Sequence, residues 1–559
     1  MLSGKHISKL TIIFVSFALL LCVLAMAFYD KLLPIVSTTG YSMEYGDKLF
    51  NTDSIIDINI VIDDAKWNEM LQNARQEQYY ECDVVINGTT FKKVGIRPKG
   101  NTSLSSIAND PNNNRYSFKL EFDQFVDGQT CFGLDKLILN NSYADATNMK
   151  ETIVYDMFQF LDAEASLYNY AKICVNNEYW GVYLALEAVE DSFMLRNYGM
   201  EKGYLYKPDS MNFGGGDNKK KAGNNNFPAP PEGGFQMPEN FGNGGQNRPQ
   251  MWGFDGNPRE NAGENKNTQG ERRSFDKGNF GGGERGGFGG FGGMGGGSNL
   301  NYTDDNLDSY QTIWNSAVND STKADHERVV KALKNVHGGT NIEKYIDVDQ
   351  ILKYMAVHNF SVNDDSLSGS MAHNYYLYEA NGQISILPWD YNLSLGGMHG
   401  GDSTSVINDP VDELWRGTKL FDFVLENEEY KTRYHEYYNK LVDEYLYGGK
   451  FEEVYNRIRN QIDELVKNDP SSMYTYEEYE KGVEVLYDAV MLRAQSIKGQ
   501  LAGAIPSTAE AQSAEPSKLV DASHLNLSDL GQFMMGGFGG NRGGNRQMPE
   551  NNNQNVANE

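Results

Sequence analysis

A long stretch of Gly, Asn, Pro, Phe and Met residues, from about 211 to 300, divides this chain of 559 residues into two parts. The stretch holds about 26 of the 58 Gly residues and shows no apolar periodicity, as in FGGGERGGFGGFGGMGGGS. Such a composition buries too little apolar surface to offset the conformational entropy that is lost on ordering. We therefore expect 211–300 to be a disordered insertion, with folded parts on both sides.

The residues before this insertion alternate short apolar runs with turn signals. Runs such as IIDINIVID, YSFKLEFD and AKICVNNEYWGVYLALE, and the Asn-Gly and Asn-Asn pairs among them, are typical of antiparallel hairpins. One amphipathic helix is expected over about 148–160, with Asp145 or Thr147 at its N-terminus. The sequence thus predicts a β-rich first part over 50–210.

The residues after the insertion favour helices. Apolar residues recur near every third or fourth position in HERVVKALKNV, IDVDQILKYMAVHNF and the segment 414–501, with one hairpin turning at 380–382. An α-rich second part is therefore expected over 301–505, which gives an α+β, two-lobed architecture. The final residues, 506–559, resemble the insertion in composition and are expected to be a disordered tail.

The N-terminal residues are typical of a membrane-inserted segment. Lys5 and Lys9 precede an apolar run over 10–29, close to the ~20 residues that cross a bilayer, which leaves 1–9 as a cytoplasmic stub. Two alternatives remain open. An uncleaved signal anchor predicts a single-pass protein of the cell membrane, and a signal peptide cleaved near Ala25 and Ala27 predicts a secreted protein. Both place the bulk of the chain outside the cytoplasm.

The charge of the chain excludes one class of partner. With 76 acidic and 49 basic residues the formal net charge is -27, whereas a nucleic-acid binder needs clustered Lys and Arg. Outside the N-terminal segment only Cys82, Cys131 and Cys174 remain, and their spacing matches no zinc site. Buried thiols fit this odd number, and so does one disulfide with one free thiol.

Polar residues gather around the predicted hairpin of the second part. Asp364 and Asp365 follow a helix, His373 and Asn374 open the first strand, and Asp390 ends the second. A hairpin brings its two ends together, and paired acids there can bind a divalent cation and accept a proton from a nucleophile. The alternative is that these aspartates cap turns, as isolated aspartates commonly do.

A second set of charged residues lies on the predicted strands of the first part. Arg97 and Lys99 belong to IRPKGNTS, a Gly-bearing turn that can cradle phosphate, although a plain hairpin also explains it. Lys119 and Lys136 stand among apolar residues, so each needs an anionic partner if it is buried. Glu151, on the following helix, is such a partner, and a strand Lys paired with a helix Glu is typical of kinase-type phosphoryl transfer.

A set of motifs spreads over most of 54–501, namely KVGIRPKGNTS, SFKLEFD, LILNNSYADATNMKE, WGVYLALE, GYLYKP, VNDDS, HNYYLY and LPWDYNLSLGG. Together they resemble the spore-coat protein CotH family of atypical, secreted protein kinases. The resemblance implies a diverged bilobal protein-kinase-like fold with a β-rich N-lobe and an α-rich C-lobe. It also implies ATP as the phosphate donor, Mg²⁺ or Mn²⁺ as the metal, and protein substrates. The long insertion and the N-terminal apolar run depart from the family's plain form.

The motifs of the second part carry the expected catalytic residues. Asp365 in NDDS resembles the catalytic-loop Asp, and Asp390 in PWD resembles the metal-binding Asp. Asp365 is preferred to Asp364 because the family's pattern has an apolar residue where Asp364 stands. Asn374 resembles a second contact to metal or phosphate.

The phosphates of ATP are expected to lie against the cationic strands of the first part. Lys119 is the first candidate for the lysine that holds them, with Lys99 and Lys136 as alternatives and Arg97 as a further phosphate contact. Glu151 is expected to fix that lysine.

Three functions remain open from the sequence. The first is a protein kinase that transfers the γ-phosphoryl group of ATP to Ser or Thr of envelope or spore-coat proteins. The second is a non-catalytic scaffold in the assembly of a coat or cell-envelope layer. The third is a carbohydrate-acting enzyme that uses Asp365 and Asp390 as paired carboxylates and, unlike the first, needs no metal.

Overall fold

The computed structural model describes residues 42–199, 203–208, 297–369, 371–398, 402–531 and 533. The described residues all belong to one compact unit, Met1–Gly216 with Phe291–Glu559. The apolar run 10–29 and most of the Gly-rich insertion lie outside the described residues, so the predicted disorder of the insertion stays a prediction.

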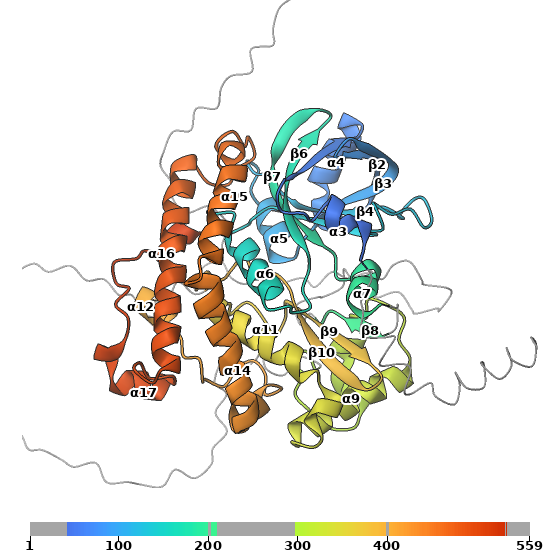
Figure 1. Cartoon of the computed structure of the whole chain (residues 1–559). Coiled ribbons are helices and arrows are strands. Elements are labelled where there is room, and N and C mark those ends of the chain that lie inside the picture. Colours follow the sequence, from blue (N-terminus) through green and yellow to red (C-terminus); the bar gives the residue numbers. More distant parts are fainter. Residues whose placement is uncertain are drawn as a thin grey trace, which may run out of the picture. The chain divides into compact units, whose positions relative to one another are not determined.

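Seven strands of the first part close into a barrel, in the order β1-β2-β3-β4-β5-β7-β6 (Figure 1). Neighbouring strands are antiparallel except β1 and β6, which run parallel, with Ile56 opposite Ala171 at the seam. Alternate side chains point inward and form an apolar core, as a small barrel requires. The strands are β1 Ile56–Val61, β2 Tyr80–Ile86, β3 Thr89–Lys99, β4 Ser117–Glu121, β5 Lys136–Asn140, β6 Tyr168–Val175 and β7 Glu178–Glu187.

The predicted hairpin turns are confirmed at two corners of the barrel. Asn87 and Gly88, between β2 and β3, have φ angles of 48° and 80°, and Asn176 and Asn177, between β6 and β7, have φ angles of 52° and 71°. Two consecutive residues with positive φ match the right-handed twist of the flanking strands, and Asn and Gly adopt them at low cost.

The predicted helix of the first part is α6, Lys150–Phe160, which follows β5. Thr147 Oγ1 accepts a hydrogen bond from the Met149 N–H at 2.9 Å, and Asp145 Oδ2 accepts one from the Lys150 N–H at 3.0 Å. Both proposed N-terminal residues therefore satisfy free N–H groups of the first turn. Figure 1 shows α6 between the barrel and α11 (Val348–Ser361).

The second part is mostly helical. A small sheet lies among its helices in the order β10-β9-β8, with β8 Tyr204–Tyr206 contributed by the first part. Its hairpin, β9 Tyr375–Ala380 and β10 Gln383–Pro388, turns at Asn381 and Gly382 as predicted. The other helices are α3 Glu44–Lys48, α4 Asp64–Gln72, α5 Thr102–Ala108, α7 Asp191–Tyr198, α8 Gln311–Trp314, α9 Lys323–His337, α10 Ile342–Tyr345, α12 Ser403–Ile407, α13 Asp422–Glu426, α14 Glu428–Lys440, α15 Lys450–Lys467 and α16 Tyr476–Leu501.

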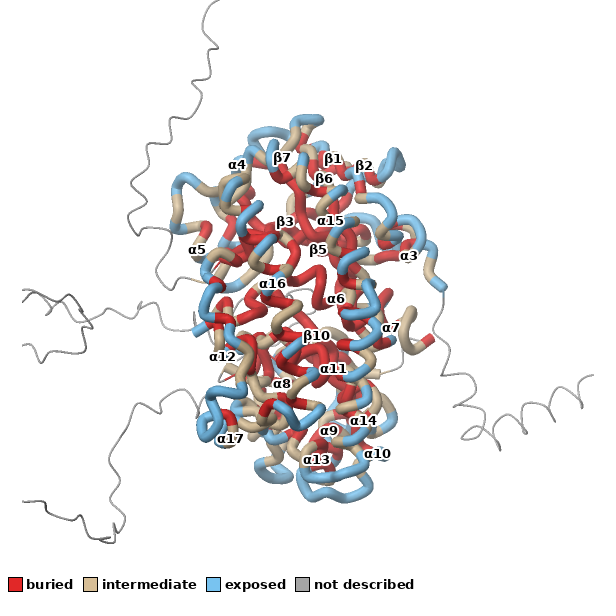
Figure 2. Tube along the Cα trace, turned by 60° about the vertical axis from the view of Figure 1, so that its left-hand side comes forward, coloured by how far each residue is buried: buried red, intermediate tan, exposed pale blue. Residues whose placement is uncertain are grey.

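The predicted bilobal protein-kinase-like fold is wrong. The strands close into a barrel, and both halves of the chain belong to one compact unit. One apolar cluster runs from α6, β6 and β7 into the helices and hairpin of the second part, and Figure 2 shows buried residues continuing through this region. The physical reason is that β8 pairs with β9 across the insertion and that α6 packs on α11, so the halves share a core.

The prediction of a single-pass membrane protein is not borne out. No helix within the part of the chain that the structure describes combines the length and the apolar character that crossing a bilayer requires. The run 10–29, on which the prediction rested, lies outside that part.

Part of the predicted disordered tail has regular structure. It contains α17 Ala509–Ala514 and two short 3₁₀ helices, η5 Pro516–Lys518 and η6 Leu527–Leu530.

Cys82, Cys131 and Cys174 are free thiols, of which the first two are buried.

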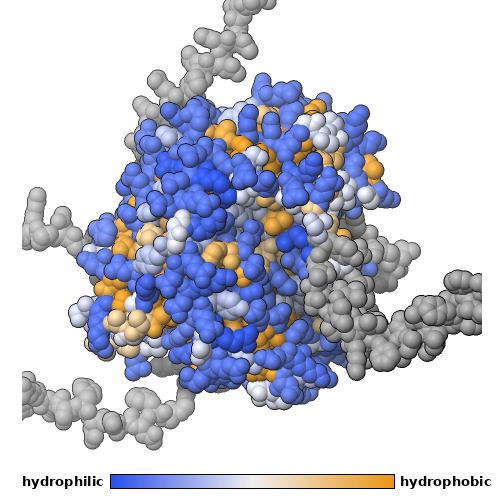
Figure 3. All heavy atoms as spheres, viewed as in Figure 1, coloured by the Kyte–Doolittle hydropathy of each residue, from blue (hydrophilic) through white to orange (hydrophobic). Residues whose placement is uncertain are grey.

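Figure 3 shows apolar residues scattered among hydrophilic ones on the face in view, as on an ordinary solvated surface.

Candidate functional site

The loop between α11 and β9 carries Asp365 and Asn374, which lie in contact. Asn374 Nδ2 donates to the backbone oxygen of Asp365 at 2.8 Å and to its Oδ2 at 3.1 Å. His373 Nε2 lies 2.9 Å from Asp365 Oδ1. The two neighbours therefore hold both carboxylate oxygens of Asp365 in place at the open end of the hairpin.

Asp390 leaves the same end of the hairpin on the other strand. Tyr375 pairs with Pro388, so Asn374, one residue before this pair, and Asp390, two residues beyond it, lie at the same end of the hairpin. Asn363 Nδ2 donates to the backbone oxygen of Asp390 at 3.2 Å, which ties it to the loop of Asp365. Asn374 and Asp390 have φ angles of 56° and 65°, a region that few residues other than Gly adopt. Such conformations persist where the surrounding contacts impose them, often at functional sites.

Two barrel strands and the helix α6 contribute Lys99, Asn140 and Glu151. Lys99 ends β3, Asn140 ends β5, and Glu151 lies in the first turn of α6. Lys99 Nζ donates to Asn140 Oδ1 at 3.1 Å, and Asn140 Nδ2 donates to Glu151 Oε2 at 3.0 Å. The amide thus bridges the cation to the carboxylate.

The electrostatics join the barrel residues to the hairpin residues. Burial lowers the pKa of the Lys99 ammonium to about 8, while the charges of Asp390 and Glu151 act to raise it. Burial, and then the charge of Asp390, raise the pKa of the Glu151 carboxyl. Burial also raises the pKa of Asp390, as does the charge of Asp365, whereas Lys99 lowers it. Four charged groups from distant parts of the sequence therefore form one cluster.

Lys207, which follows β8, is a member of the cluster that the sequence analysis missed. Its charge lowers the pKa of Asp390 and of Lys99. Its Nζ lies 5.2 Å from the centre of the Trp389 ring and 5.4 Å from that of Tyr376, within the range of cation–π attraction. The motif GYLYKP contains this lysine, but only the pairing of β8 with β9 brings it to Asp390.

Two of the predicted phosphate-binding residues lie in a different cluster. Lys119 Nζ is 2.9 Å from Glu190 Oε1, and Lys136 forms an ion pair with the same carboxylate. The expected pairing of Lys119 with Glu151 is therefore replaced by pairing with Glu190. Arg97 forms an ion pair with Glu77. Of the predicted cations, Lys99 is the one whose charge acts on Asp390.

The buried side chain of His358 contacts the loop that carries Asp365. His358 Nδ1 lies 3.0 Å from Tyr391 Oη, and its Nε2 lies 2.7 Å from Ser368 Oγ. Burial lowers the pKa of His358 to about 3, so the ring is neutral at physiological pH. One uncharged ring thus connects the loop after α11 with the residue that follows Asp390.

The carboxylates of the cluster could supply some of the ligands of a metal ion, while a bound phosphate compound and water supply the others. Among the described residues, no three His, Cys, Asp or Glu side chains are grouped to hold a metal ion by themselves. Mg²⁺ typically binds one or two carboxylates and takes its other ligands from water and substrate phosphates. The charge of Asp390 raises the pKa of Glu151, and the charge of Asp365 raises that of Asp390. A bound cation would relieve this repulsion.

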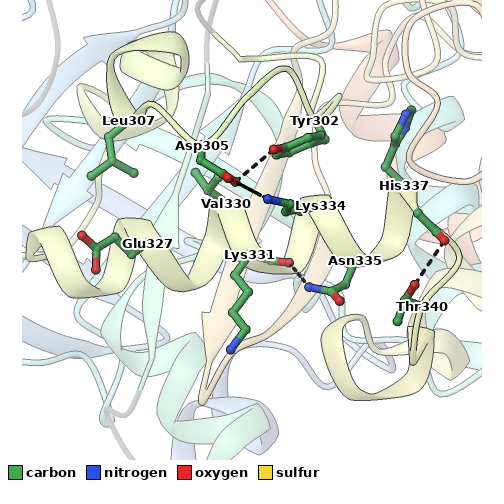
Figure 4. Close-up of a pocket in the computed structure, with 11 residues that line it drawn as sticks. Tyr302, Asp305, Leu307, Glu327, Val330, Lys331, Lys334, Asn335, His337 and Thr340 are labelled. Atoms are coloured by element: carbon green, nitrogen blue, oxygen red, sulfur yellow. Dashed lines mark hydrogen bonds and ion pairs between the residues drawn. The ribbon is translucent and has the colours of Figure 1, made fainter.

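A surface hollow of about 800 Å³ lies elsewhere, along α9 (Figure 4). Lys334 Nζ lies 2.6 Å from Asp305 Oδ2 there, and Tyr302 Oη donates to Asp305 Oδ1 at 2.9 Å. Its opposite charges neutralise each other, and none of the predicted catalytic or phosphate-binding residues lines it. The hollow therefore adds nothing to the cluster around Asp390.

Two comparisons with known proteins bear on this cluster. The family model described as CotH kinase protein matches residues 96–237 and 292–497, more than half of the chain. The inner spore coat protein H of Bacillus subtilis (strain 168) is 25% identical over 169 residues, which cover 29% of this chain and 43% of that protein. The chain thus spans less than half the length of this relative. All the residues of the cluster fall within the range of the family model, and the chain belongs to the CotH kinase protein family.

Proposed function

We propose that this chain transfers the γ-phosphoryl group of ATP to Ser or Thr hydroxyls of other proteins, with Mg²⁺ or Mn²⁺ as cofactor. The observation that carries the proposal is the shared electrostatic cluster of Lys99, Glu151 and Asp390, with Asp365 held beside it. A lysine, its glutamate partner, a metal-binding aspartate and a catalytic aspartate are the parts that phosphoryl transfer to a hydroxyl requires.

Lys99 and Lys207 have the charge that ATP phosphates need. Lys99 is fixed by the bridge through Asn140 to Glu151. Lys207 is fixed by its two aromatic neighbours, which leave its ammonium within electrostatic reach of Asp390. Two cations approaching from different elements favour a polyanionic ligand over a single carboxylate.

Asp390 is the group that we propose as the metal ligand, with the Asn374 side-chain oxygen as a second contact. Asn374 Nδ2 is occupied by Asp365, which leaves the amide oxygen of Asn374 for a cation. When bound, the metal would supply positive charge that neutralises the transferring phosphates.

Asp365 is the group that we propose for the acceptor hydroxyl. Its carboxylate orients the hydroxyl and takes the proton as the oxygen forms its bond to the γ-phosphorus, while the bond to the β,γ-bridging oxygen breaks and ADP leaves. His373 and Asn374 keep the carboxylate in position during this transfer.

The relative's name, inner spore coat protein H, supports proteins of a spore coat or envelope layer as the substrate class. A non-catalytic scaffold in such a layer is the alternative.

Two matched substitutions distinguish the alternatives. Asp365→Asn removes the proposed base, whereas Asp364→Asn removes the neighbouring exposed carboxylate. With γ-labelled ATP, Mg²⁺ and a Ser/Thr-rich acceptor protein, we expect Asp365→Asn to lose at least ~100-fold in rate and Asp364→Asn to stay within about twofold. Equal rates in both variants, or no transfer by the wild type, would overturn the proposal in favour of the scaffold.

A further inference from the structure

The chain continues beyond the family-matched residues and returns along α16 to the barrel. The family model ends at residue 497. Ile505 N–H then donates to Gly499 O at 3.0 Å near the end of α16, and Asp529 Oδ2 lies 2.8 Å from Lys481 Nζ near its beginning. The segment 519–531 together with Phe533, which we call the C-terminal clamp, therefore runs antiparallel to α16. This segment lies beyond the residues that the family model matches.

The first part of the C-terminal clamp is fastened to α12. Val520 N–H donates to Asn408 Oδ1 at 3.0 Å, and Asn408 Nδ2 donates back to Val520 O at 2.9 Å. Ser403 Oγ donates to Ala522 O at 2.8 Å, and Ala522 is fully buried. These contacts fix the clamp to the helix that follows the Asp390 loop along the chain.

The last part of the C-terminal clamp touches both sides of the proposed active site. On the barrel side, Ala146 N–H donates to Leu530 O at 3.0 Å, and the Phe533 ring lies 6.2 Å from that of Tyr143. On the hairpin side, Phe533 N–H donates to Gly397 O at 3.1 Å. Four residues of chain thus bridge the loop 141–149 and the loop 391–398.

These two loops adjoin residues of the site. The loop 141–149 joins Asn140 to α6 and Glu151, and the loop 391–398 directly follows Asp390. A movement of one loop against the other would change the separation of Glu151 and Asp390, on which the pKa of Glu151 depends. The loops also contact each other directly, because Asn392 Nδ2 donates a hydrogen bond to Tyr143 O at 2.7 Å. Tyr143 is the residue whose ring the clamp contacts through Phe533.

We propose that Leu530, Gly531 and Phe533 of the C-terminal clamp are positioning residues, which set the separation between the barrel side and the hairpin side of the site. The effect on ATP rests on the proposed function, whereas the effect on the two loops does not. Gly531 is the most sensitive point, because its φ is 88° and an added Cβ would lie 2.7 Å from Ala144 O and 2.8 Å from Ala146 N. A side chain there must push the clamp away from the barrel.

The test compares Gly531→Val with Gly503→Val in the full chain. Gly503 has a similar φ of 71°, but an added Cβ there would meet no atom within 4 Å, so the control shares the backbone strain without the collision. The first measurement is hydrogen exchange of the backbone amides of 141–149 and 391–398. The second is the steady-state kinetics of phosphoryl transfer at varied ATP concentration.

We expect Gly531→Val to speed exchange in both loops at least ~10-fold while β9 and β10 keep wild-type exchange, and Gly503→Val to match the wild type in both loops. We expect the KM for ATP to rise at least ~5-fold with kcat changed less, because ground-state binding suffers first. If the backbone amides of either loop in Gly531→Val exchange at the wild-type rate, the proposed role of the C-terminal clamp is wrong. Faster exchange in a protein that transfers no phosphate would uphold the clamp and overturn the proposed function instead.

Discussion

At the scale of single residues, Lys99 differs from an ordinary lysine because it is half-buried and the charges of two carboxylates act on it. Burial lowers the pKa of its ammonium to about 8, close to the pH at which the protein would work, and the bridge through Asn140 fixes its position. A lysine that titrates near pH 8 loses its charge in mildly alkaline solution. Any step that needs this charge must show the same pH dependence.

We therefore expect kcat/KM for ATP to fall as the pH rises through about 8, because Lys99 is cationic below its pKa and neutral above it. The fall approaches ~10-fold per pH unit on the alkaline side. Lys99→Arg keeps its charge at these pH values and should lose the alkaline fall, even if its absolute activity is lower. Initial rates between pH 6.5 and 9.5 measure both profiles, and superimposable profiles would refute the role of Lys99.

Lys207→Met should weaken the binding of ATP, whereas Lys119→Met should lower the stability of the fold. Lys207 acts on Asp390, so its loss should weaken ATP binding ~10-fold or more, the value of one charge-assisted hydrogen bond. Lys119 pairs with Glu190 at 2.9 Å, so its loss should instead lower the free energy of unfolding by ~1–3 kcal/mol. ATP titration calorimetry and urea unfolding measure the two quantities. A larger loss of ATP affinity in Lys119→Met would restore the assignment made from the sequence.

The sequence predicts that Asp365, Asn374 and Asp390 lie near one another because they flank one hairpin, and local pairing brings its ends together. It does not predict that Lys119 pairs with Glu190 and not with Glu151, because alternation along β4 says which residues share a face, not which part of that face lies opposite α6. Lys99 and Asn140 are at strand ends, and these ends meet Glu151. The choice among the lysines depends on tertiary structure.

At the scale of elements, the barrel and the helices are joined by a buried ion pair. Arg115, which precedes β4, places its Nη1 2.7 Å from Oδ2 of Asp469, which lies between α15 and α16, and both side chains are at most 3% exposed. Asp469 Oδ2 also accepts a hydrogen bond from the Val182 N–H of β7 at 3.0 Å. Such a pair stabilises the junction only while both partners are present, because either charge alone would be buried without compensation.

Asp469→Asn should therefore lower the free energy of unfolding by ~3 kcal/mol or more. The control is Glu453→Gln on α15, which breaks an exposed ion pair with Lys450 and should cost less than ~1 kcal/mol. Urea unfolding followed by tryptophan fluorescence gives both values. Equal losses in the two variants would show that the junction does not depend on Asp469.

The individual helices and strands are largely predictable from the sequence, but the closure of the strands into a barrel is not. The hairpin turns at Asn87–Gly88 and Asn176–Asn177 and the helix α6 follow from local sequence. The parallel pairing of β1 with β6, which closes the barrel, joins Ile56 to Ala171 across more than one hundred residues. No local pattern encodes that pairing, so the sequence yields a sheet but not a barrel.

At the scale of the whole molecule, one compact unit takes in both sides of the Gly-rich segment. β8 pairs with β9 just before that segment, and Tyr375, the first residue of β9, forms a hydrogen bond with the backbone oxygen of Ser298 just after it. Both ends of the segment are thus fastened to the same strand. We therefore expect the stability of the folded unit to depend little on the segment's length.

Replacement of 217–290 by a short Gly-Ser linker should leave the melting temperature within ~3 °C of the wild type, because loop length changes the closure entropy only slowly. Differential scanning calorimetry gives this value. A fall of more than ~10 °C would show that 217–290 contribute to the fold of the unit.

The transfer of the γ-phosphoryl group is tested most simply with ATP labelled at either its α- or its γ-phosphate, in the presence of Mg²⁺, for the wild type and Asp390→Asn. We expect the wild type to attach only the γ-label to protein, and Asp390→Asn to attach at least ~100-fold less while its melting temperature stays close to the wild-type value. Attachment of the α-label would mean transfer of a nucleotidyl group. Equal attachment of the γ-label by both proteins would remove Asp390 from the reaction and contradict the proposed site.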